Sequence, residues 1–543
     1  MTIRGLGIGL SLCALLACPG PRWAQPLDVR DAQIWGNQAA LPLVPIRVKV
    51  NNPASARQVV LTMEDGHGRQ RTAVDLPSGA RKELEMIVRP TLGPTRLLIQ
   101  EGFATRVVNL EVASGGTRAG TLAVISDTPG DFSAVRSGRL RPDDPEIRDV
   151  YAAPGRAPTR MSAYTGMAAI ILSDGAERLT DAEVRAIQQA VVAGTLLVVP
   201  TGTPKPILSD PRWQGWWPAR VTGSRNVTRL TPFARDGALP QGPLTMATAT
   251  PVGDAWMQTF DGVLLTASRP VGLGRVLMLG YDPAVGSLRQ WDRLGQHLQR
   301  VILSERNAVG RQVWSGPARQ FTRTDQWSQG VEESGLELKA PPAEFVWLSL
   351  GIFLILVGPI QFLILRRLDK GELAWVITPA LSVAFAFGVV SVGQRGLSRF
   401  QQRETLAVIG VGPAGSVVAG AARQTFFLPE AGSYDMQLAP MDAIGFENSG
   451  FGGTEANFAY SREVGDDGVM VLPRLKVNSL AFVPLTLMGE FPAPPEMGGA
   501  VEIAGTPRRT LLKGSVTNRT SEPLNMVNLI IGTAPVPWDQ PLG

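Results

Sequence analysis

The chain has 543 residues, of which 44% are hydrophobic and 18% are charged, and its formal net charge is +5. This length predicts several domains, and a mean hydropathy of +0.07 is too low for a multi-span transporter but high for a wholly soluble protein. The excess of basic residues is small and forms no dense tract with interleaved aromatic residues, so no nucleic-acid partner is expected.

Cysteine and histidine are scarce, which limits the chemistry open to the chain. The two cysteines, Cys13 and Cys18, lie in an N-terminal apolar stretch, and the two histidines, His67 and His297, lie far apart. Once that stretch is removed, the remaining domains contain no thiol nucleophile, disulfide or thiolate metal site. We therefore expect no cofactor and no metal. His67 is interpreted as a solvated turn residue and His297 as a surface or packing residue of a helix.

Residues 1–25 have the pattern of a signal peptide. Arg4 supplies the positive charge, and the apolar run over 6–17 is too short to span a bilayer comfortably. Two cleavage sites compete. One is a lipobox ending at Cys18, which would make that cysteine the lipidated N-terminus, and the other is ordinary cleavage after Ala24. Either site predicts export of the residues that follow.

Short apolar strands separated by turn residues follow over 27–114. Residues 44–50 alternate and lead into an Asn-Asn-Pro turn, and 59–63, 97–99 and 107–112 continue the series. Several short strands with turn chemistry between them are typical of a β-sandwich, and an immunoglobulin-like (Ig-like) sandwich is predicted.

Over 120–306 the pattern changes to alternating strands and helices. Residues 180–183, Thr-Asp-Ala-Glu, form a capping box that opens a helix, and Gly194 ends that helix. Fully apolar strands joined by helices predict a parallel sheet that is covered on both faces. Residues 307–342 are interpreted as a linker. The predicted strands of this α/β domain are 122–125, 168–172, 196–199 and 276–279.

Polar residues that follow these strands are the first candidate binding residues. Ligands of open α/β sheets bind beyond the carboxyl ends of the strands, where Asp127, Asp174 and Thr201 are expected to gather. A divalent-ion site made of the two aspartates is one interpretation. The favoured alternative is that both aspartates are turn or helix-capping residues.

A cluster of tryptophans in one loop, Trp213, Trp216 and Trp217, is the second candidate. Exposed rings would make a contact patch for a protein, a glycan or a membrane surface. Rings packed together would make a local hydrophobic cluster, which is the interpretation that we favour.

The strongest signal is a pair of uncharged apolar runs, 345–365 and 373–393, each long enough to cross about 30 Å of hydrocarbon. The loop between them, 366–372, is basic, so the positive-inside rule places it in the cytoplasm, and a cleaved signal peptide predicts the same orientation. We expect a transmembrane hairpin in a bacterial cytoplasmic membrane, with both large regions on the extracytoplasmic, periplasmic side. Gln361 is expected to hydrogen-bond to the second span. The residues that determine this topology are Arg366, Arg367 and Lys370.

The remaining residues, 399–543, are rich in glycine, proline and short apolar strands. They predict a second extracytoplasmic, β-rich region. The predicted fold is thus multidomain, with an Ig-like β-sandwich, an α/β parallel-sheet domain, a two-helix transmembrane hairpin and a C-terminal β-rich domain.

Several segments together resemble a class-I glutamine-amidotransferase-like domain, with its flavodoxin-like parallel sheet, in the form found in bacterial membrane proteins. The resemblance implies this fold and a membrane hairpin after it. It also implies a degenerate domain with no catalytic residue, because the Cys nucleophile of the amidotransferases and its paired His are missing. The segments that carry the resemblance are 168–174, 179–180, 193–199, 272–276, 280–283, 358–362, 374–375 and 378–379.

We therefore predict a non-catalytic, membrane-anchored binding or assembly protein of the cell envelope, acting as a subunit of a larger membrane complex. The resemblance implies protein partners such as MoxR-type ATPases, von Willebrand factor A-type modules or transporter components. Two alternatives stay open: an envelope hydrolase with an unrecognised active site, and an auxiliary subunit of a transport system.

Overall fold

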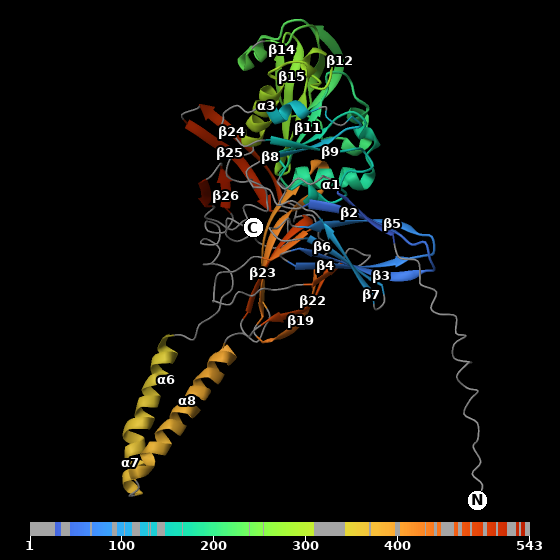
Figure 1. Cartoon of the computed structure of the whole chain (residues 1–543). Helices are drawn as coiled ribbons and strands as arrows, with labels where there is room; N and C mark the ends of the chain where they lie inside the picture. Colours follow the sequence, from blue (N-terminus) through green and yellow to red (C-terminus); the bar gives the residue numbers. More distant parts are fainter. Residues whose placement is uncertain are drawn as a thin grey trace, which may run out of the picture.

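β-Strands build most of the protein, and two long apolar helices extend away from them (Figure 1). The signal peptide with Cys18, His67, residues 309–342 of the predicted linker and Lys370 lie outside the residues that the structure describes. This computed structural model describes residues 28–33, 44–65, 68–88, 95–101, 104–110, 120–128, 130, 132–137, 147–165, 167–237, 239–253, 255–308, 343–368, 371–396, 402–428, 430–438, 443–446, 461–464, 470–477, 481–491, 497–506, 509–518, 528–531 and 534–537.

The chain begins with two packed β-sheets, as the alternating apolar pattern predicts. Ile46 and Val48 of a three-stranded sheet, ordered β1-β2-β5, are buried in the same core as Leu61 and Leu97 of a second sheet. Alternate residues face inward because side chains on a strand point to opposite faces in turn. The strands are β1 (Asp28–Gln33), β2 (Val44–Asn51), β3 (Arg57–Asp65), β4 (Gly68–Leu76), β5 (Arg81–Val88), β6 (Thr95–Glu101) and β7 (Ala104–Leu110).

That second sheet also takes strands from the chain after the apolar helices. Its seven strands run in the order β19-β22-β21-β4-β3-β6-β7. β21 lies parallel to β4, with Ser461 opposite Arg69. The predicted boundaries at 114 and 399 therefore divide strands that share one sheet. The added strands are β19 (Gly432–Leu438), β21 (Ser461–Val464) and β22 (Met470–Val477).

The α/β region contains a seven-stranded mixed sheet in the order β14-β15-β16-β11-β10-β8-β9. The run from β16 to β9 is parallel, and β15 and β14 extend it in the antiparallel sense. The sequence predicted β8, β10, β11 and β16 but missed the other three strands. The strands are β8 (Gly120–Ile125), β9 (Ile147–Ala152), β10 (Ala169–Leu172), β11 (Leu196–Pro200), β14 (Trp256–Phe260), β15 (Val263–Val271) and β16 (Gly274–Leu279).

Helices cover both faces of this sheet. Ile170 and Leu172 of β10 are buried in the core that contains α1 (Asp181–Val192), whereas Ala169 and Ile171 are buried in the core that contains α3 (Leu294–Ala308). The capping box that opens α1 at Thr180 is confirmed. Shorter elements complete the region: η1 (Ser133–Ser137), η2 (Met161–Ala163), η3 (Ala176–Arg178), η4 (Pro206–Ser209), η5 (Pro211–Trp213), β12 (Ala219–Val227), η6 (Thr231–Asp236), β13 (Leu244–Pro251) and α2 (Gly286–Arg289).

The chain after the apolar helices is β-rich, as predicted. A four-stranded sheet in the order β17-β18-β23-β20 packs against α1, and its Ala419 and Ala421 belong to the same core as that helix. The elements are β17 (Gln402–Val411), η9 (Pro413–Gly415), β18 (Val418–Leu428), β20 (Ala443–Phe446), β23 (Ala481–Glu490), the pair β24 (Met497–Thr506) and β25 (Arg509–Asn518), and the pair β26 (Asn528–Ile531) and β27 (Ala534–Pro537).

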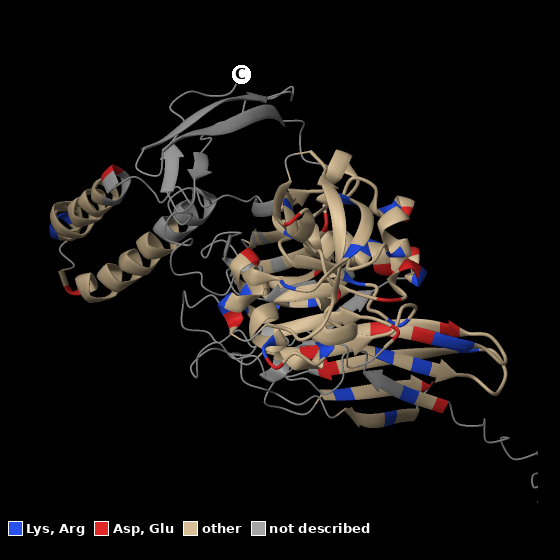
Figure 2. Ribbon diagram, turned by 90° about the horizontal axis from the view of Figure 1, so that it is seen from above, with Lys and Arg blue, Asp and Glu red and all other residues tan. Residues whose placement is uncertain are grey.

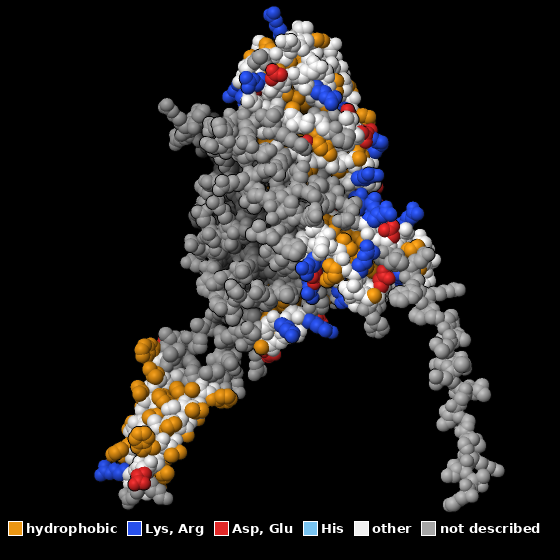
Figure 3. All heavy atoms as spheres, viewed as in Figure 1, with side chains coloured by type: hydrophobic (Ala, Val, Ile, Leu, Met, Phe, Trp, Pro, Cys, Tyr) orange, Lys and Arg blue, Asp and Glu red, His pale blue; other side chains and the backbone are white. Residues whose placement is uncertain are grey.

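Two antiparallel apolar helices form the hairpin, and its surface is covered with hydrophobic side chains (Figure 3). The first consists of α6 (Ala343–Ile355), a π-helical turn η7 (Leu356–Ile360) that contains Pro359, and α7 (Gln361–Arg367), which ends with Arg366 and Arg367. After η8 (Gly371–Leu373) comes α8 (Ala374–Gly396). Gln361 donates to the Thr378 hydroxyl at 2.8 Å, which confirms the predicted contact between helices. The length and composition of both helices are consistent with membrane association.

Candidate functional site

The structure brings the three predicted polar residues to one edge of the α/β sheet, but each is already engaged within the protein. The backbone N–H of Asp127 donates to the carbonyl of Asp174 at 3.0 Å, so the two loops touch. The Asp127 carboxylate forms an ion pair with Arg178. The hydroxyl of Thr201 is buried and donates to the carbonyl of Leu279 at 2.7 Å. All three residues therefore help to hold the loops at this edge.

Lys205 joins the loops at this edge of the sheet, and the sequence analysis did not predict this role. Its side chain is only 7% exposed, and its Nζ lies 2.7 Å from Asp174 Oδ1 and 2.7 Å from Asp282 Oδ2. Asp174 follows β10 and Asp282 follows β16, while Lys205 follows β11, the strand between them. We call Asp174, Lys205 and Asp282 the edge triad. The only sequence pattern that could have identified Lys205 is a lone lysine after an apolar strand, and this pattern is weak.

The edge triad stabilises a charged lysine in a buried position. Burial by itself lowers the pKa of Lys205, but the charge of Asp282 and the hydrogen bonds to both carboxylates outweigh that effect, so the pKa is raised. Lys205 therefore carries its charge at neutral pH and acts as an internal cation. A lysine in this state is a poor nucleophile because its amine stays protonated.

A divalent ion would have to compete with these cations. Asp127 and Asp174, which one interpretation made a metal site, each accept an ion pair from a different basic residue. Within the described residues, no three His, Cys, Asp or Glu side chains gather closely enough to hold a metal. The arrangement at this edge thus fits the favoured alternative of structural turn residues.

The tryptophan cluster is internal. Trp213 and Trp216 are almost fully buried and Trp217 is 9% exposed. The Trp213 ring stacks on Trp217 at 5.4 Å and meets Trp216 edge-on at 5.5 Å. The alternative prediction of an exposed contact patch for a partner is wrong, because the rings bury one another and join the core that contains α1. The interpretation as a local hydrophobic cluster agrees with this burial.

His297 is a buried packing residue with two polar partners. Its Nδ1 lies 2.8 Å from Asp236 Oδ2 and its Nε2 lies 2.6 Å from the Tyr281 hydroxyl. An ionised carboxylate only accepts, so Nδ1 donates to Asp236. Asp236 also forms an ion pair with Arg300. Burial, and then the charge of Asp236, raise the pKa of Tyr281, which keeps its hydroxyl protonated. This network ties α3 to η6 and to the end of β16.

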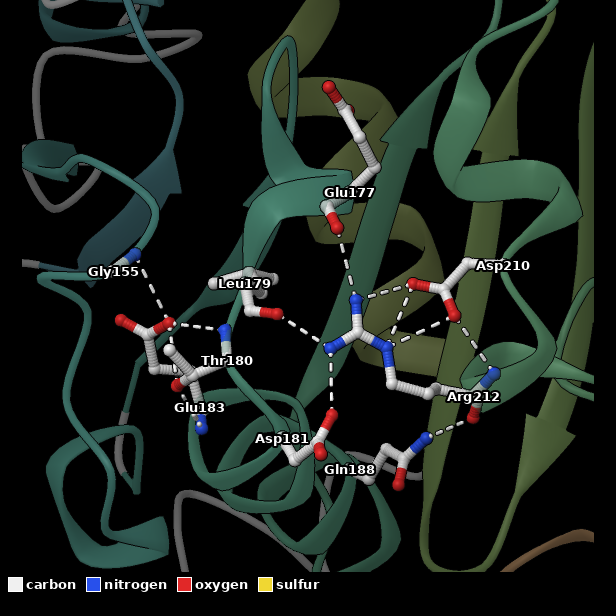
Figure 4. A network of polar contacts seen from close by, with 9 residues as sticks. All are labelled: Gly155, Glu177, Leu179, Thr180, Asp181, Glu183, Gln188, Asp210 and Arg212. Atoms are coloured by element: carbon white, nitrogen blue, oxygen red, sulfur yellow. Dashed lines mark hydrogen bonds and ion pairs between the residues drawn. The ribbon is translucent and has the colours of Figure 1, made fainter.

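A third network surrounds the N-terminus of α1, and Arg212 is at its centre (Figure 4). The Arg212 guanidinium donates to the Asp210 carboxylate, with the shortest bond at 2.7 Å. It also donates to the carbonyls of Leu179 at 2.6 Å and Glu177 at 3.0 Å. Hydrogen bonds from Arg212 lower the pKa of Asp210, against the opposing effect of burial. The loop that leads from Asp174 into α1 is thereby fixed to the loop after β11.

Glu183 holds the other side of the same helix terminus. Its carboxylate accepts from the Thr180 backbone at 2.7 Å, which completes the capping box, and from the backbone N–H of Gly155 at 3.1 Å (Figure 4). It also accepts from the backbone N–H of Ala157 at 2.7 Å. The sequence predicted the cap but not the contacts with the loop after β9, which come from residues far from α1 in the chain.

Comparisons with known proteins give no family. No family model and no curated protein matches the chain. Among solved structures, a cytoplasmic protein, STM1381, from Salmonella typhimurium LT2 is similar over 34% of this chain and 99% of its own, at 12% identity and a TM-score of 0.27. An exo-beta-1,4-mannosidase, Op5Man5, from Opitutaceae bacterium strain TAV5 is similar over 35% of this chain and 36% of its own, at 18% identity and a TM-score of 0.23. Likenesses at these scores carry no argument about function.

Proposed function

We propose that this chain is a non-catalytic binding and assembly protein that a two-helix hairpin anchors in a bacterial cytoplasmic membrane, as a subunit of a larger membrane complex. The observation that supports this most is the sheet in which β21 pairs with β4. Strands from before and after the hairpin share a sheet, so both large regions lie on one side of any membrane that the hairpin crosses. The two apolar helices would thus anchor one folded body, which contains both regions, on that side of the membrane.

The orientation proposed is with this body on the extracytoplasmic, periplasmic side. Arg366 and Arg367 end α7 at the tip of the hairpin, and the tip is the end remote from the β-sheets (Figure 1). Basic residues at the tip favour a cytoplasmic location for it. The apolar stretch over 6–17, as an export signal, supports the same side.

The proposed domain folds are an Ig-like sandwich before residue 114 and an amidotransferase-like α/β domain over 120–306. The spatial order β9-β8-β10-β11-β16 supports the second. Numbered along the chain, these five parallel strands are in the order 2-1-3-4-5, which is the order of a flavodoxin-like sheet. The edge triad supports a non-catalytic role: a buried lysine occupies the space beyond the strand ends where a ligand of such a sheet would bind.

The partners proposed are MoxR-type ATPases, von Willebrand factor A-type modules or transporter components. The test is affinity purification of the full chain from its native membrane in mild detergent, followed by mass spectrometry. We expect a constant, stoichiometric set of membrane or ATPase subunits. The matched control is a chain whose residues 343–396 are replaced by an unrelated apolar hairpin, which shows whether partners bind the hairpin or the β-rich body. Recovery of the native chain alone, at native expression, would contradict the proposal.

A further inference from the structure

The seven-stranded sheet that contains β4 ends in a strand, β7, whose outer side is unpaired among the described residues. β7 pairs with β6 in an unbroken register, from Thr95 opposite Leu110 to Glu101 opposite Ala104, and with no other described strand. In an antiparallel strand, alternate residues direct their backbone N–H and C=O groups away from the neighbouring strand. The groups of β7 that point away from β6 can therefore bind one further strand.

β7 also lacks most of the features that protect an edge strand from pairing with another chain. Such strands commonly contain a bulge, a proline or several charges. At the opposite edge of the same sheet, β19 has a bulge between Tyr434 and Met436 and carries Asp435 at this point. β7 has neither a bulge nor a proline, and Arg106 is its one charged residue. The central residue of β7, Val107, is 52% exposed.

The sequence of β7 is complementary to itself in one antiparallel register. When two copies of a strand pair about a two-fold axis, one residue lies opposite its own counterpart. A pair centred on Val107 aligns all seven residues of both strands. It places Arg106 opposite Val108 of the second copy, and Thr105 opposite Asn109 of the second copy. A pair centred on Arg106 would instead place two like charges opposite each other, which is destabilising.

Pairing in this register buries the exposed side chain of Val107. Leu98 of β6 lies opposite Val107 and is itself half-buried. Residues that lie opposite each other on neighbouring strands project from the same face of the sheet. The junction of two copies therefore has a row of four apolar side chains, one Leu98 and one Val107 from each copy. Removal of this row from water favours a second copy as the strand that covers the edge.

We infer that β7 pairs with β7 of a second copy of this chain, in an antiparallel register centred on Val107, so that two seven-stranded sheets become one continuous sheet. This inference goes beyond the proposed function, because it names a second copy as one component of the assembly and identifies the surface that binds it. It concerns only the β-rich body and does not depend on whether the hairpin crosses a membrane.

Disulfide cross-linking of the full chain in mild detergent tests the register. Val107→Cys should form a covalent dimer under mild oxidation, because Cα atoms directly opposite each other are about 5 Å apart, within reach of a disulfide. Arg106→Cys is the matched control. Arg106 is also exposed, but in this register its Cα lies about 8 Å from its counterpart, too far for a disulfide.

Three results of this experiment overturn the inference. The first is no covalent dimer from Val107→Cys, and the second is an equal yield of dimer from the two variants. The third is a cross-link from Val107→Cys to a different protein, identified by mass spectrometry, because another chain would then cover this edge.

Sedimentation of the detergent-solubilised chain measures the same pairing without a covalent bond. Val107→Lys should raise the dissociation constant of the dimer at least about tenfold, because two lysines opposite each other repel. Val411→Lys is the control, since Val411 is 42% exposed on β17 and should leave the dissociation constant unchanged. An unchanged dissociation constant in Val107→Lys overturns the inference. A monomeric chain that co-purifies with other subunits contradicts only this inference, whereas a dimer recovered without any other protein contradicts only the proposed function.

Discussion

Arg185 on α1 donates two hydrogen bonds to the carboxylate of Glu490 at the end of β23, at 3.1 Å and 2.5 Å, although 305 positions separate the two residues. The hairpin lies between them in the chain. This contact therefore joins the region before the hairpin to the region after it, at the place where α1 packs on β18.

The contact between Arg185 and Glu490 should contribute modestly to stability, because their side chains are 60% and 40% exposed. In a double-mutant cycle with Arg185→Met and Glu490→Gln, we expect a coupling free energy of about 0.5 kcal/mol in urea unfolding. The pair Arg225 and Asp261 has similar exposure within the α/β region and is the matched control. Strictly additive effects of the two substitutions would show that the contact contributes nothing.

Gly410→Ala should destabilise the protein by about 1–3 kcal/mol, because the new methyl group meets the backbone carbonyl of Val192, which cannot rotate away. Gly432→Ala is the control. Gly432 also lies in a strand after the hairpin, but its nearest neighbour is the Tyr434 ring at 3.5 Å, an ordinary contact. Thermal unfolding of the purified chain measures both. Equal melting temperatures for the two variants would mean that β17 and α1 are not in close contact.

Lys205→Met should destabilise the protein by about 3–5 kcal/mol, because it leaves the buried Asp282 without its cation. Adding Asp282→Asn removes the uncompensated charge, keeps the acceptor that binds the backbone N–H of Ala284, and should restore most of the loss. Lys49→Met, which breaks a half-exposed pair with Glu83, should cost less than about 1 kcal/mol. If the double variant is no more stable than Lys205→Met, the edge triad is not held together by charge.

Acid should weaken the network around Arg212. The folded-state pKa of Asp210 is below its ordinary value of 3.8, so the stability it contributes is fully present above about pH 4 and is lost as the pH falls through the folded-state pKa. Asp210→Asn should flatten the stability curve below about pH 4 and leave stability above that pH uniformly lower. If stability falls as steeply with acid in that variant as in the native chain, protonation of another group causes the loss.

An engineered disulfide tests the shared sheet. Cysteines at Arg69 and Ser461, which are opposite each other on β4 and β21, should cross-link under mild oxidation, since the chain has only Cys13 and Cys18 otherwise. Arg69→Cys with Arg462→Cys is the control, because adjacent residues on a strand point to opposite faces. The readout is mobility on a non-reducing gel. Equal yields for the two pairs would contradict the pairing of β4 with β21.

Charged residues are dense on the strands of the first region (Figure 2), and their alternation with buried residues made those strands predictable. In β6, Arg96 and Gln100 are exposed while Leu97 and Ile99 are buried. The capping box at Thr180 and the apolar run of β10 were equally readable, because local chemistry decides where a helix begins and how a buried strand is composed. β9 was missed because Arg148 and Asp149 interrupt its apolar pattern.

The polar networks were harder to predict than the elements. Asp174 was placed correctly at the edge of the sheet, but its partner Lys205 carries no local signature. Arg212 lies in a loop whose tryptophans were interpreted as a buried cluster or, as the alternative, a contact surface, and they are buried. Neither interpretation assigned a role to the arginine. Both basic residues acquire their roles from carbonyls and carboxylates that other elements present, so only the assembled loops reveal them.

Local patterns in the chain thus determined the type of most elements, the two apolar helices and the polar residues that follow the strands of the α/β sheet. Strand pairing was decided by the tertiary structure. β4 accepts β21 across a separation of almost 400 residues, and α1 buries its second face against β17 and β18. An amphipathic pattern predicts that one face of an element is buried. It does not predict which other element packs against that face, because many apolar surfaces in one chain could do so equally well.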